Sequence, residues 1–507
     1  MTSKLPIYEI IPDLKKKISS HNALVLQAPP GAGKTTVVPL ELLNEPFLKN
    51  RKIIMLEPRR LAARAAAHRM ANILGEKIGE TIGYRVRMDS KVGPNTKVEV
   101  VTEGILIRQL QSDPELRNVG MVIFDEFHER SIEADLGLAL CLDIQEGFRE
   151  DLKLIVMSAT LDGEKVAQLM GAAPILTSQG QTFPVERRFL PRKPNDRIEQ
   201  SMVGAIMKAL EEESGSILAF LPGAGEIERT KKVLEEKNLS KNISISPLYS
   251  MMNFSDQDKA ISPALKGERK VVLATSIAET SLTIVGIRIV IDSGLSRNAF
   301  YDTKSGMPGL ETKMVSKASA DQRAGRAGRL EAGICYRLWS QAADRALLPF
   351  TTPEIKRADL TSLLLNLNQW GVRDFHDLNW LDEPEKASID HAADLLKSLE
   401  ALNENGITEL GRKMVLFPMH PRLSHMVNKA IELNIGSLAL CIAALLEERD
   451  ILSLNHDLKT ADLRLRIEAL MHIKNNEIME AKRLGCKISA SKKVLLQVKQ
   501  WHGNFRI

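Results

Sequence analysis

The sequence has few cysteines, no long apolar run and little net charge, and each shortage excludes a class of protein. Its cysteines are far apart and match neither a disulfide framework nor a zinc site; they are Cys141, Cys335, Cys441 and Cys486. No stretch approaches about 18 uninterrupted apolar residues, and the first residues contain no apolar segment of signal-peptide length. We therefore expect no membrane span, and we expect reduced, buried thiols in a cytoplasmic protein.

Positive and negative charges are nearly balanced over the whole chain. The 507 residues hold 69 Lys or Arg and 64 Asp or Glu, a net of +5, and 44% of residues are hydrophobic, which is typical of a globular protein. The basic excess lies at the end, because Lys459–Ile507 has 11 basic and 4 acidic residues, a net of +7. The length predicts three or four domains. A charge of +5 over this length does not by itself indicate a nucleic-acid partner.

Short apolar runs alternate with helical patterns in two series. Such runs are typical of buried parallel strands joined by crossover helices, which predicts one doubly wound α/β domain over residues 1–180 and a second over residues 181–345. The runs are Leu24–Leu26, Ile53–Leu56, Val98–Val101, Met121–Phe124, Leu154–Met157, Ile217–Leu221, Val271–Ala274 and Ile287–Ile291. Leu61–Ala71 is predicted to be a crossover helix, and the proline-punctuated stretch 181–194 is interpreted as the linker. After Pro353 the patterns are mainly helical.

The segment Ala28–Thr35 follows the first predicted strand and is rich in small residues. Its glycines would let consecutive amide N–H groups turn toward a nucleoside triphosphate. Lys34 would reach the β- and γ-phosphates, and the Thr35 hydroxyl would bind Mg²⁺. A turn that only joins a strand to a helix is the alternative. The residues expected to bind the nucleotide here are Gly31, Gly33, Lys34, Thr35 and Thr36.

Two carboxylates directly follow the predicted strand Met121–Phe124. Carboxylates at the carboxyl end of a parallel strand project into the crevice where such sheets bind ligands. Asp125 would hold Mg²⁺, and Glu126 would orient and deprotonate the attacking water, with His128 following in the same motif. A solvated turn is the alternative. The position of the Asp125-Glu126 pair, about 90 residues after the phosphate loop, favours NTP hydrolysis.

Further motifs follow in a recognisable order. Ser158–Thr160 comes after the next predicted strand, and Thr275–Thr283 and Gln322–Arg329 lie in the second α/β domain. Together with the two motifs above, they resemble the motif set of superfamily 2 helicases of the DEAH/RHA group. Phe127 takes the place of the alanine that names the group, at a spacer position. The chain is similar to bacterial HrpB-type ATP-dependent helicases in Phe220–Ile227, Lys317–Gln322 and Met419–Leu423.

The resemblance covers nearly the whole chain and implies its domain organisation. Within the α/β class, it implies two tandem RecA-like P-loop domains at 1–180 and 181–345. A winged-helix domain at 346–412 and a helical, ratchet-like domain at 413–507 would follow. Members of the family normally continue into further C-terminal domains, so we expect this sequence to be either truncated or a short member.

The resemblance also implies why a second lobe is needed. The transition state of phosphoryl transfer spreads negative charge over its oxygens, and an arginine finger from another element is worth about 10³–10⁵ in rate. Arg326 and Arg329 are the candidate fingers, and Gln322 would help to place the water. A basic surface turn is the alternative for this segment. Ser158 and Thr160 would couple hydrolysis to lobe movement, unless they are only a polar strand end.

Contacts with a nucleic-acid strand are assigned in both lobes by the resemblance. Arg59 and Thr102 would hold backbone phosphates in the first lobe and Thr275 in the second, although Arg59 could equally be an ordinary helix start. Arg297–Lys313 contains a Gly-Pro turn between two extended runs, which predicts a strand-separating hairpin with Arg297 at its start. Because only 4% of residues are aromatic, phosphate contacts should dominate over base stacking, and binding should weaken with salt.

Recognition of the nucleotide base is expected to be weak. The family places an arginine against the base, at Arg69 in this sequence. The aromatic partner expected across the cleft falls near Ile261, which offers no π-face for stacking. Low selectivity among NTPs is therefore a hypothesis.

We predict an ATP-driven, Mg²⁺-dependent helicase or translocase that prefers single-stranded RNA to DNA, with 3′→5′ the direction that the family implies. The chain is expected to be a cytoplasmic monomer. One alternative is an RNA-stimulated ATPase that remodels RNA–protein complexes without unwinding duplexes. The other is a non-hydrolysing RNA-binding scaffold, against which the intact catalytic motifs argue. Lys459–Ile507 would be one wall of the nucleic-acid channel or, as the alternative, a solvated helix face.

Overall fold

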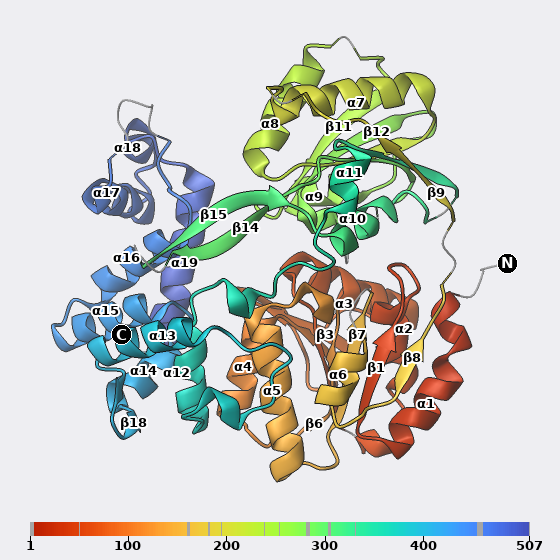
Figure 1. The fold of residues 1–507 in the computed structure, drawn as a ribbon. Helices are drawn as coiled ribbons and strands as arrows, with labels where there is room; N and C mark the ends of the chain where they lie inside the picture. Colours follow the sequence, from red (N-terminus) through yellow and green to blue (C-terminus); the bar gives the residue numbers. More distant parts are fainter. Residues whose placement is uncertain are drawn as a thin grey trace. The chain divides into compact units, whose positions relative to one another are not determined.

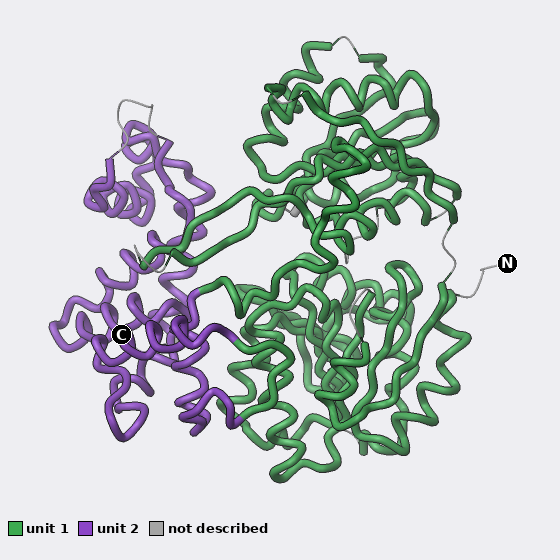
Figure 2. Tube along the Cα trace, viewed as in Figure 1, with its two compact units in different colours: residues 1–358, 378–383 green, residues 359–377, 384–507 purple. Residues whose placement is uncertain are grey.

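The computed structural model describes residues 5–49, 51–159, 163–180, 183–193, 195–237, 239–252, 254–279, 284–302, 306–329, 331–453 and 460–505. The chain divides into two compact units (Figure 2): unit 1 comprises Met1–Ala358 and Leu378–Glu383, and unit 2 comprises Asp359–Asp377 and Pro384–Ile507. Unit 1 contains two large sheets, and unit 2 is mainly helical. In the part of the chain that the structure describes, no helix is long and apolar enough to cross a membrane.

Eight strands form the first sheet of unit 1, in the order β4-β3-β5-β2-β6-β7-β1-β8 (Figure 1). They are β1 (Ala23–Gln27), β2 (Lys52–Leu56), β3 (Ile82–Val86), β4 (Asp89–Lys91), β5 (Val98–Val101), β6 (Val119–Phe124), β7 (Lys153–Ser158) and β8 (Ile175–Thr177). All neighbouring pairs are parallel except β3 with β4. The central strands are buried throughout, which explains their mainly apolar sequences.

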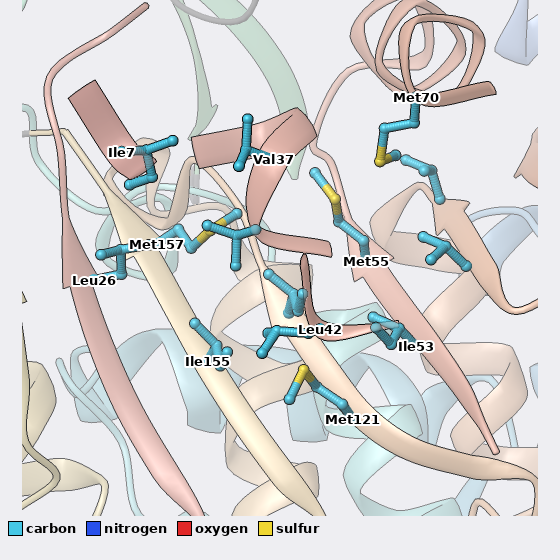
Figure 3. Packing of buried hydrophobic residues seen from close by; sticks show 14 of the residues in the cluster. Ile7, Leu26, Val37, Leu42, Ile53, Met55, Met70, Met121, Ile155 and Met157 are labelled. Atoms are coloured by element: carbon cyan, nitrogen blue, oxygen red, sulfur yellow. The ribbon is translucent and has the colours of Figure 1, made fainter. Parts of the chain in front are cut away.

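Helices connect these strands and cover the sheet. They are α1 (Ile11–Ser20), α2 (Lys34–Leu42), α3 (Arg60–Leu74), α4 (Glu103–Ser112), α5 (Ile132–Gly147) and α6 (Gly163–Leu169). The first three share one apolar core with the strands, and Figure 3 shows Val37 and Leu42 of α2 among strand residues such as Ile155. The predicted crossover helix over Leu61–Ala71 is confirmed by α3. This packing fixes the carboxyl ends of the strands, where the site residues lie.

Six parallel strands form the second sheet, in the order β11-β12-β10-β13-β16-β9. They are β9 (Val185–Phe189), β10 (Ser216–Phe220), β11 (Ile243–Leu248), β12 (Arg269–Ala274), β13 (Ile287–Asp292) and β16 (Gly333–Arg337). The interpretation of 181–194 as a linker is wrong for Val185–Phe189, because this segment is strand β9 at the edge of the sheet. An edge strand with partly exposed side chains needs no apolar run, so the sequence pattern did not indicate it.

Two layers of helices pack against the second sheet. Helices α7 (Ile198–Glu212) and α8 (Ala224–Glu235) share one apolar core with the strands. Helices α9 (Phe254–Ile261) and α10 (Lys317–Ala324) contribute to a second core. Between β13 and α10 the chain forms an antiparallel hairpin of β14 (Leu295–Asp302) and β15 (Met307–Met314), which confirms the hairpin predicted at 297–313. The short helix α11 (Gln341–Arg345) follows β16.

Unit 2 contains a small hairpin among helices. Its elements are α12 (Thr361–Trp370), α13 (Lys386–Ser398), β17 (Leu402–Asn403), β18 (Gly406–Ile407), α14 (Glu409–Leu416), α15 (Pro421–Glu432), α16 (Gly436–Glu447), α17 (Leu463–Lys474), α18 (Ile478–Arg483) and α19 (Ile488–Phe505). The later helices share one apolar core that includes Val494 and Trp501 of α19. The basic C-terminal segment is therefore part of a packed domain. The domain limits 346–412 and 413–507 stay predictions.

The four cysteines are free thiols. Cys141, Cys335 and Cys486 are buried, and Cys441 is partly buried.

Candidate functional site

The loop between β1 and α2 has the backbone conformation of a phosphate-binding loop. Gly31 and Gly33 have φ angles of +89° and +99°, which side-chain-bearing residues rarely adopt. Gly33 is the residue before α2, and Lys34 and Thr35 form the first turn of this helix. The first amide N–H groups of a helix lack partners within it and favour anions. This loop can therefore surround a phosphate chain, with Thr36 on the same first turn.

Asp125 and Glu126 leave the carboxyl end of β6 in a strained turn. The amide N–H of Asp125 donates to the Leu56 carbonyl at 3.0 Å, and the amide of Glu126 donates to Asp125 Oδ1 at 2.8 Å. Glu126 has a φ of +50°, an uncommon value for a residue other than glycine, which such backbone bonds must hold in place. Phe127 is buried and meets the Phe124 ring edge-on, with the ring centroids 6.1 Å apart. Phenylalanine at this position therefore serves packing.

The loop and the carboxylates meet directly. Lys34 Nζ lies 3.0 Å from Glu126 Oε1 and 3.9 Å from Asp125 Oδ1, and all three side chains are buried. Burial opposes ionisation of Glu126, but the adjacent Lys34 ammonium lowers the pKa of this carboxyl to about 2. Burial also acts against the charge of Lys34, yet the two carboxylates raise its pKa. Glu126 is therefore ionised, as a general base must be.

Thr35 and Asp125 offer oxygen atoms that suit Mg²⁺. Thr35 Oγ1 donates to Asp125 Oδ2 at 2.5 Å, so the hydroxyl and the carboxylate are adjacent. Burial raises the pKa of Asp125, and a bound cation would offset this cost of burying its charge. Within the described ranges, no group of three or more His, Cys, Asp or Glu side chains is placed to hold a metal ion. A magnesium ion here would take its remaining ligands from phosphate oxygens and water.

His128 connects the carboxylates to the next strand. Its Nδ1 accepts a hydrogen bond from the Ala159 amide at 3.4 Å and lies 3.4 Å from Glu126 Oε2. Burial lowers the pKa of His128, so the ring is neutral at pH 7. Ser158 is buried at the end of β7, and its carbonyl accepts from the Ala28 amide at 3.0 Å. The Ser158 segment thus contacts both the phosphate loop and the His128 motif, whereas Thr160 lies outside the described residues.

The candidate arginine fingers lie close enough to Glu126 for their charges to act on it. Arg326 is 4% exposed, and its Nε donates to the Glu279 carbonyl at 2.9 Å. Burial lowers the pKa of Arg326 well below its usual value, and burial lowers the pKa of Arg329 to about 10. The charge of Glu126 favours the ionised form of both groups. Buried guanidinium groups of this kind suit an anion such as a transferring phosphate. Gln322 is buried on α10, which ends shortly before Arg326.

The residues predicted to contact a nucleic-acid strand have different surroundings. Arg59 pairs with Glu129 at 3.2 Å and donates to the Ser276 carbonyl at 2.7 Å, so it connects the two sheets of unit 1. Thr102 is the residue before α4, and the Thr275 amide donates to the Leu248 carbonyl at 3.2 Å. These three residues lie at strand ends.

Two further predicted residues lie apart from this group. Arg297 on β14 donates to Glu226 Oε1 at 2.9 Å and to Thr312 Oγ1 at 3.3 Å. Arg69 is exposed on α3. The structure therefore brings neither to the carboxylates.

Sequence reasoning missed Glu57, which follows β2 directly. Its side chain is fully buried, and its amide donates to the Val101 carbonyl at 2.9 Å, next to the end of β5. Its charge raises the pKa of both Lys34 and Arg59. Glu57 is thus a third carboxylate between the phosphate loop and the predicted strand contacts. The sequence signal that could have indicated this residue is an acidic side chain between the apolar run Ile53–Leu56 and Pro58-Arg59.

Three family models match the chain. The model described as DEAD/DEAH box helicase matches residues 8–169, and the helicase conserved C-terminal domain matches residues 201–331. The winged-helix helicase associated domain (HA2) matches residues 392–419. The predicted fold class is confirmed: two RecA-like domains, a winged-helix domain and a helical C-terminal region.

Individual relatives match over most of the chain. It is 48% identical over 446 residues to the ATP-dependent RNA helicase HrpB of Escherichia coli (strain K12), covering 88% of this chain and 55% of the relative. It is 38% identical over 435 residues to the ATP-dependent RNA helicase HrpA of Borreliella burgdorferi, covering 84% and 52%. The crystal structure of the Escherichia coli DEAH/RHA helicase HrpB matches with a TM-score of 0.89 at 43% identity, covering 99% of this chain and 61% of that one. The chain spans little more than half the length of the curated relatives it matches.

Proposed function

Because this chain belongs to the DEAH/RHA group of superfamily 2 helicases, we propose that it is an ATP-dependent helicase or translocase that acts on RNA. The observation that carries this proposal is the contact between the phosphate loop and the carboxylates. Lys34 lies 3.0 Å from Glu126, and Thr35 lies 2.5 Å from Asp125. Hydrolysis of ATP needs these four groups together.

In the proposed reaction, Glu126 accepts a proton from the water that attacks the γ-phosphorus. The bond from this phosphorus to the β–γ bridging oxygen breaks, and the products are ADP and inorganic phosphate. Glu126 Oε2 is buried and accepts no hydrogen bond from the described residues, so this oxygen is available to a water. Lys34 would bind phosphate oxygens in competition with Glu126. Mg²⁺ held by Thr35 and Asp125 would neutralise charge on the transferring group.

The second lobe would supply the remaining positive charge. Arg326 and Arg329 would stabilise the charge that develops on the phosphoryl oxygens, with Gln322 placing the water. Ser158 and Thr160 would pass the change in the nucleotide site to the movement of the lobes. Their segment already contacts His128 and the phosphate loop through Ala159 and Ser158, which supports this role.

Strand binding is proposed through phosphate contacts of Arg59, Thr102, Thr275 and Arg297. Arg59 is now held by Glu129 and the Ser276 carbonyl, so an RNA phosphate would compete with these partners. Arg297 lies on the β14–β15 hairpin, which would separate strands during 3′→5′ movement. The exposed lysines of α19 would form part of one channel wall. Preference for single-stranded RNA over DNA, a monomeric state and a cytoplasmic location belong to the same proposal.

Selectivity for the nucleotide base is proposed to be low. Arg69 is exposed and offers a guanidinium group to a base, and Ile261, at the end of α9, has no π-face to stack on its other side. Comparable turnover of ATP, GTP and CTP is the expected result. A strong preference for ATP would contradict this part of the proposal.

The test is the rate of ATP hydrolysis with matched RNA and DNA, each single- and double-stranded, at two salt concentrations. We expect stimulation by single-stranded RNA above all, and we expect weaker binding at the higher salt concentration. Stimulation without any strand displacement would favour the alternative of a remodelling ATPase. No hydrolysis at saturating RNA would favour a binding scaffold and refute the proposal.

A further inference from the structure

Arg323 is a buried arginine on α10 with no role in the site described above. Its side chain is 1% exposed, and it lies three residues before Arg326, which follows the end of α10. Its Nε donates to Glu279 Oε2 at 3.1 Å. Its Nη1 donates to Asp292 Oδ1 at 2.8 Å and to the Leu295 carbonyl at 3.2 Å. One guanidinium group therefore joins α10 to two other segments, one at Glu279 and one at the connection from Asp292 to Leu295.

The first of these contacts leads to the candidate arginine finger. Glu279 binds Arg323 through its carboxylate, and its backbone carbonyl accepts from Arg326 Nε at 2.9 Å. Ser319 Oγ, also on α10, donates to Glu279 Oε1 at 2.5 Å. A displacement of Glu279 would therefore move the carbonyl on which Arg326 is held.

The other contacts lead to the base of the β14–β15 hairpin. Asp292 ends β13, is fully buried, and accepts from the Gly294 amide through Oδ1 at 2.9 Å. The Gly294 carbonyl accepts from the Val315 amide at 2.9 Å, which closes the base of the hairpin. Gly294 has a φ of +72°, and a Cβ there would lie 2.7 Å from the Trp339 ring. The hairpin base is thus tightly fixed to Asp292, and through Asp292 and Leu295 to Arg323.

Two carboxylates compensate the charge of Arg323 in its buried position. Burial acts against the charge, but Asp292 and Glu279 raise the pKa of the guanidinium group. The guanidinium carbon also lies 5.0 Å from the centre of the Phe220 ring. A lysine has one ammonium group in place of the planar fork and cannot make all these contacts in the same geometry.

We propose that Arg323 is a positioning residue that joins the arginine-finger loop to the base of the β14–β15 hairpin, so that movement of Arg326 during hydrolysis is passed to the hairpin. This inference rests on the proposed function and adds a structural connection between the two activities. Arg323 itself would touch neither ATP nor RNA. Its effect would pass through Glu279 on one side and through Asp292 and Leu295 on the other.

The test compares Arg323→Lys with Arg337→Lys in the full chain. Arg337 is also 1% exposed in the same lobe and pairs with two carboxylates, Asp321 at 2.7 Å and Asp344 at 2.6 Å. Arg337 is the matched control because its two ion pairs are with carboxylates other than Glu279 and Asp292. Each variant is measured for thermal unfolding, for kcat and KM of RNA-stimulated hydrolysis, and for duplexes separated per ATP hydrolysed.

We expect Arg323→Lys to lower kcat by about 10-fold or more, because small misplacements of a catalytic group are costly, and to leave KM for ATP nearly unchanged. We also expect fewer duplexes separated per ATP hydrolysed. Arg337→Lys should lower the unfolding temperature but leave this ratio unchanged. If Arg323→Lys does not fold, Asp292→Asn takes its place, since the amide keeps an acceptor oxygen and removes the charge.

A wild-type ratio in a folded Arg323 or Asp292 variant would overturn the inference and leave the proposed function intact. The same reduction of the ratio in Arg337→Lys would also overturn it, because the effect would then come from loss of any buried ion pair. Wild-type protein without RNA-stimulated hydrolysis would refute the proposed function and this role with it.

Discussion

Replacing Glu126 with glutamine removes the proposed general base and leaves the phosphate loop in place. Lys34 holds Glu126 Oε1 at 3.0 Å and keeps the pKa of the carboxyl at about 2, so the base is fully ionised at pH 7. An amide cannot accept a proton, and loss of a general base lowers turnover by about 10²–10⁴-fold. ATP binding should be equal or tighter, because Lys34 no longer pairs with a carboxylate.

The loss of rate must be separated from a loss of folding. Removing one partner of a buried ion pair can lower the free energy of unfolding by about 3–5 kcal/mol. The glutamine oxygen can still accept from Lys34, and Asp125 remains at 3.9 Å, so we expect a decrease of about 1–2 kcal/mol in the free energy of unfolding. Urea unfolding measures this decrease. A loss of this size leaves nearly all molecules of a typical domain folded.

The assay is steady-state ATP hydrolysis with saturating single-stranded RNA, together with equilibrium binding of ATP. Glu99→Gln is the matched control, because Glu99 is 1% exposed, lies in the same sheet and accepts from Arg85 Nε at 2.6 Å. The control should lose stability and keep its hydrolysis rate. Near-normal hydrolysis by folded Glu126→Gln would refute the assignment of Glu126 as the base.

Three further predictions concern stability and strand binding. Burial, with neighbouring carboxylates, raises the pKa of Glu103 from 4.5 to about 8. Between these pH values the folded state keeps a proton that the unfolded chain loses, so the free energy of unfolding falls as the pH rises. Glu103→Gln should therefore raise the free energy of unfolding at pH 8.5 by at most about 4–5 kcal/mol and change it little at pH 5; equal effects at both pH values would contradict this reasoning. Arg59→Ala should weaken single-stranded RNA binding and lower its salt slope by about 1, as measured by fluorescence anisotropy, whereas an unchanged slope would exclude a phosphate contact. Lys492 and Lys499 are exposed on α19, so their joint replacement by glutamate should weaken RNA binding and lower the slope by about 2, and unchanged binding would leave α19 a solvated face.

The proposed nucleotide site was predictable because its residues follow buried strands. Thr35 and Asp125 are 90 residues apart, yet each motif comes directly after an apolar run, and the carboxyl ends of parallel strands meet at one edge of a sheet. The hairpin was predictable from the Gly and Pro residues between two extended runs, although Pro308 itself lies in strand β15, where it pairs with Tyr301. Strand β9 was not, since Val185–Phe189 is an edge strand with charged residues in place of an apolar run.

Residues that act through partners distant in sequence were not predictable. Arg323 was one of several arginines in its motif, and only the fold shows that it reaches Glu279 and Asp292, 44 and 31 residues away. Glu57 gave a similarly weak signal, because burial beside Lys34 depends on the register of β2. The predicted contact residue Arg59 has protein partners in this structure, and no sequence pattern indicated its bond to the Ser276 carbonyl.

We propose that ATP hydrolysis at the Lys34–Glu126 site drives movement along RNA. Strand displacement from an RNA duplex with a 3′ single-stranded overhang, measured with and without ATP against the same duplex with a 5′ overhang, tests it most directly. We expect ATP-dependent displacement from the 3′ overhang, none from the 5′ overhang, and none with Glu126→Gln. Displacement that does not require ATP, or that persists in the Glu126→Gln variant, would contradict it.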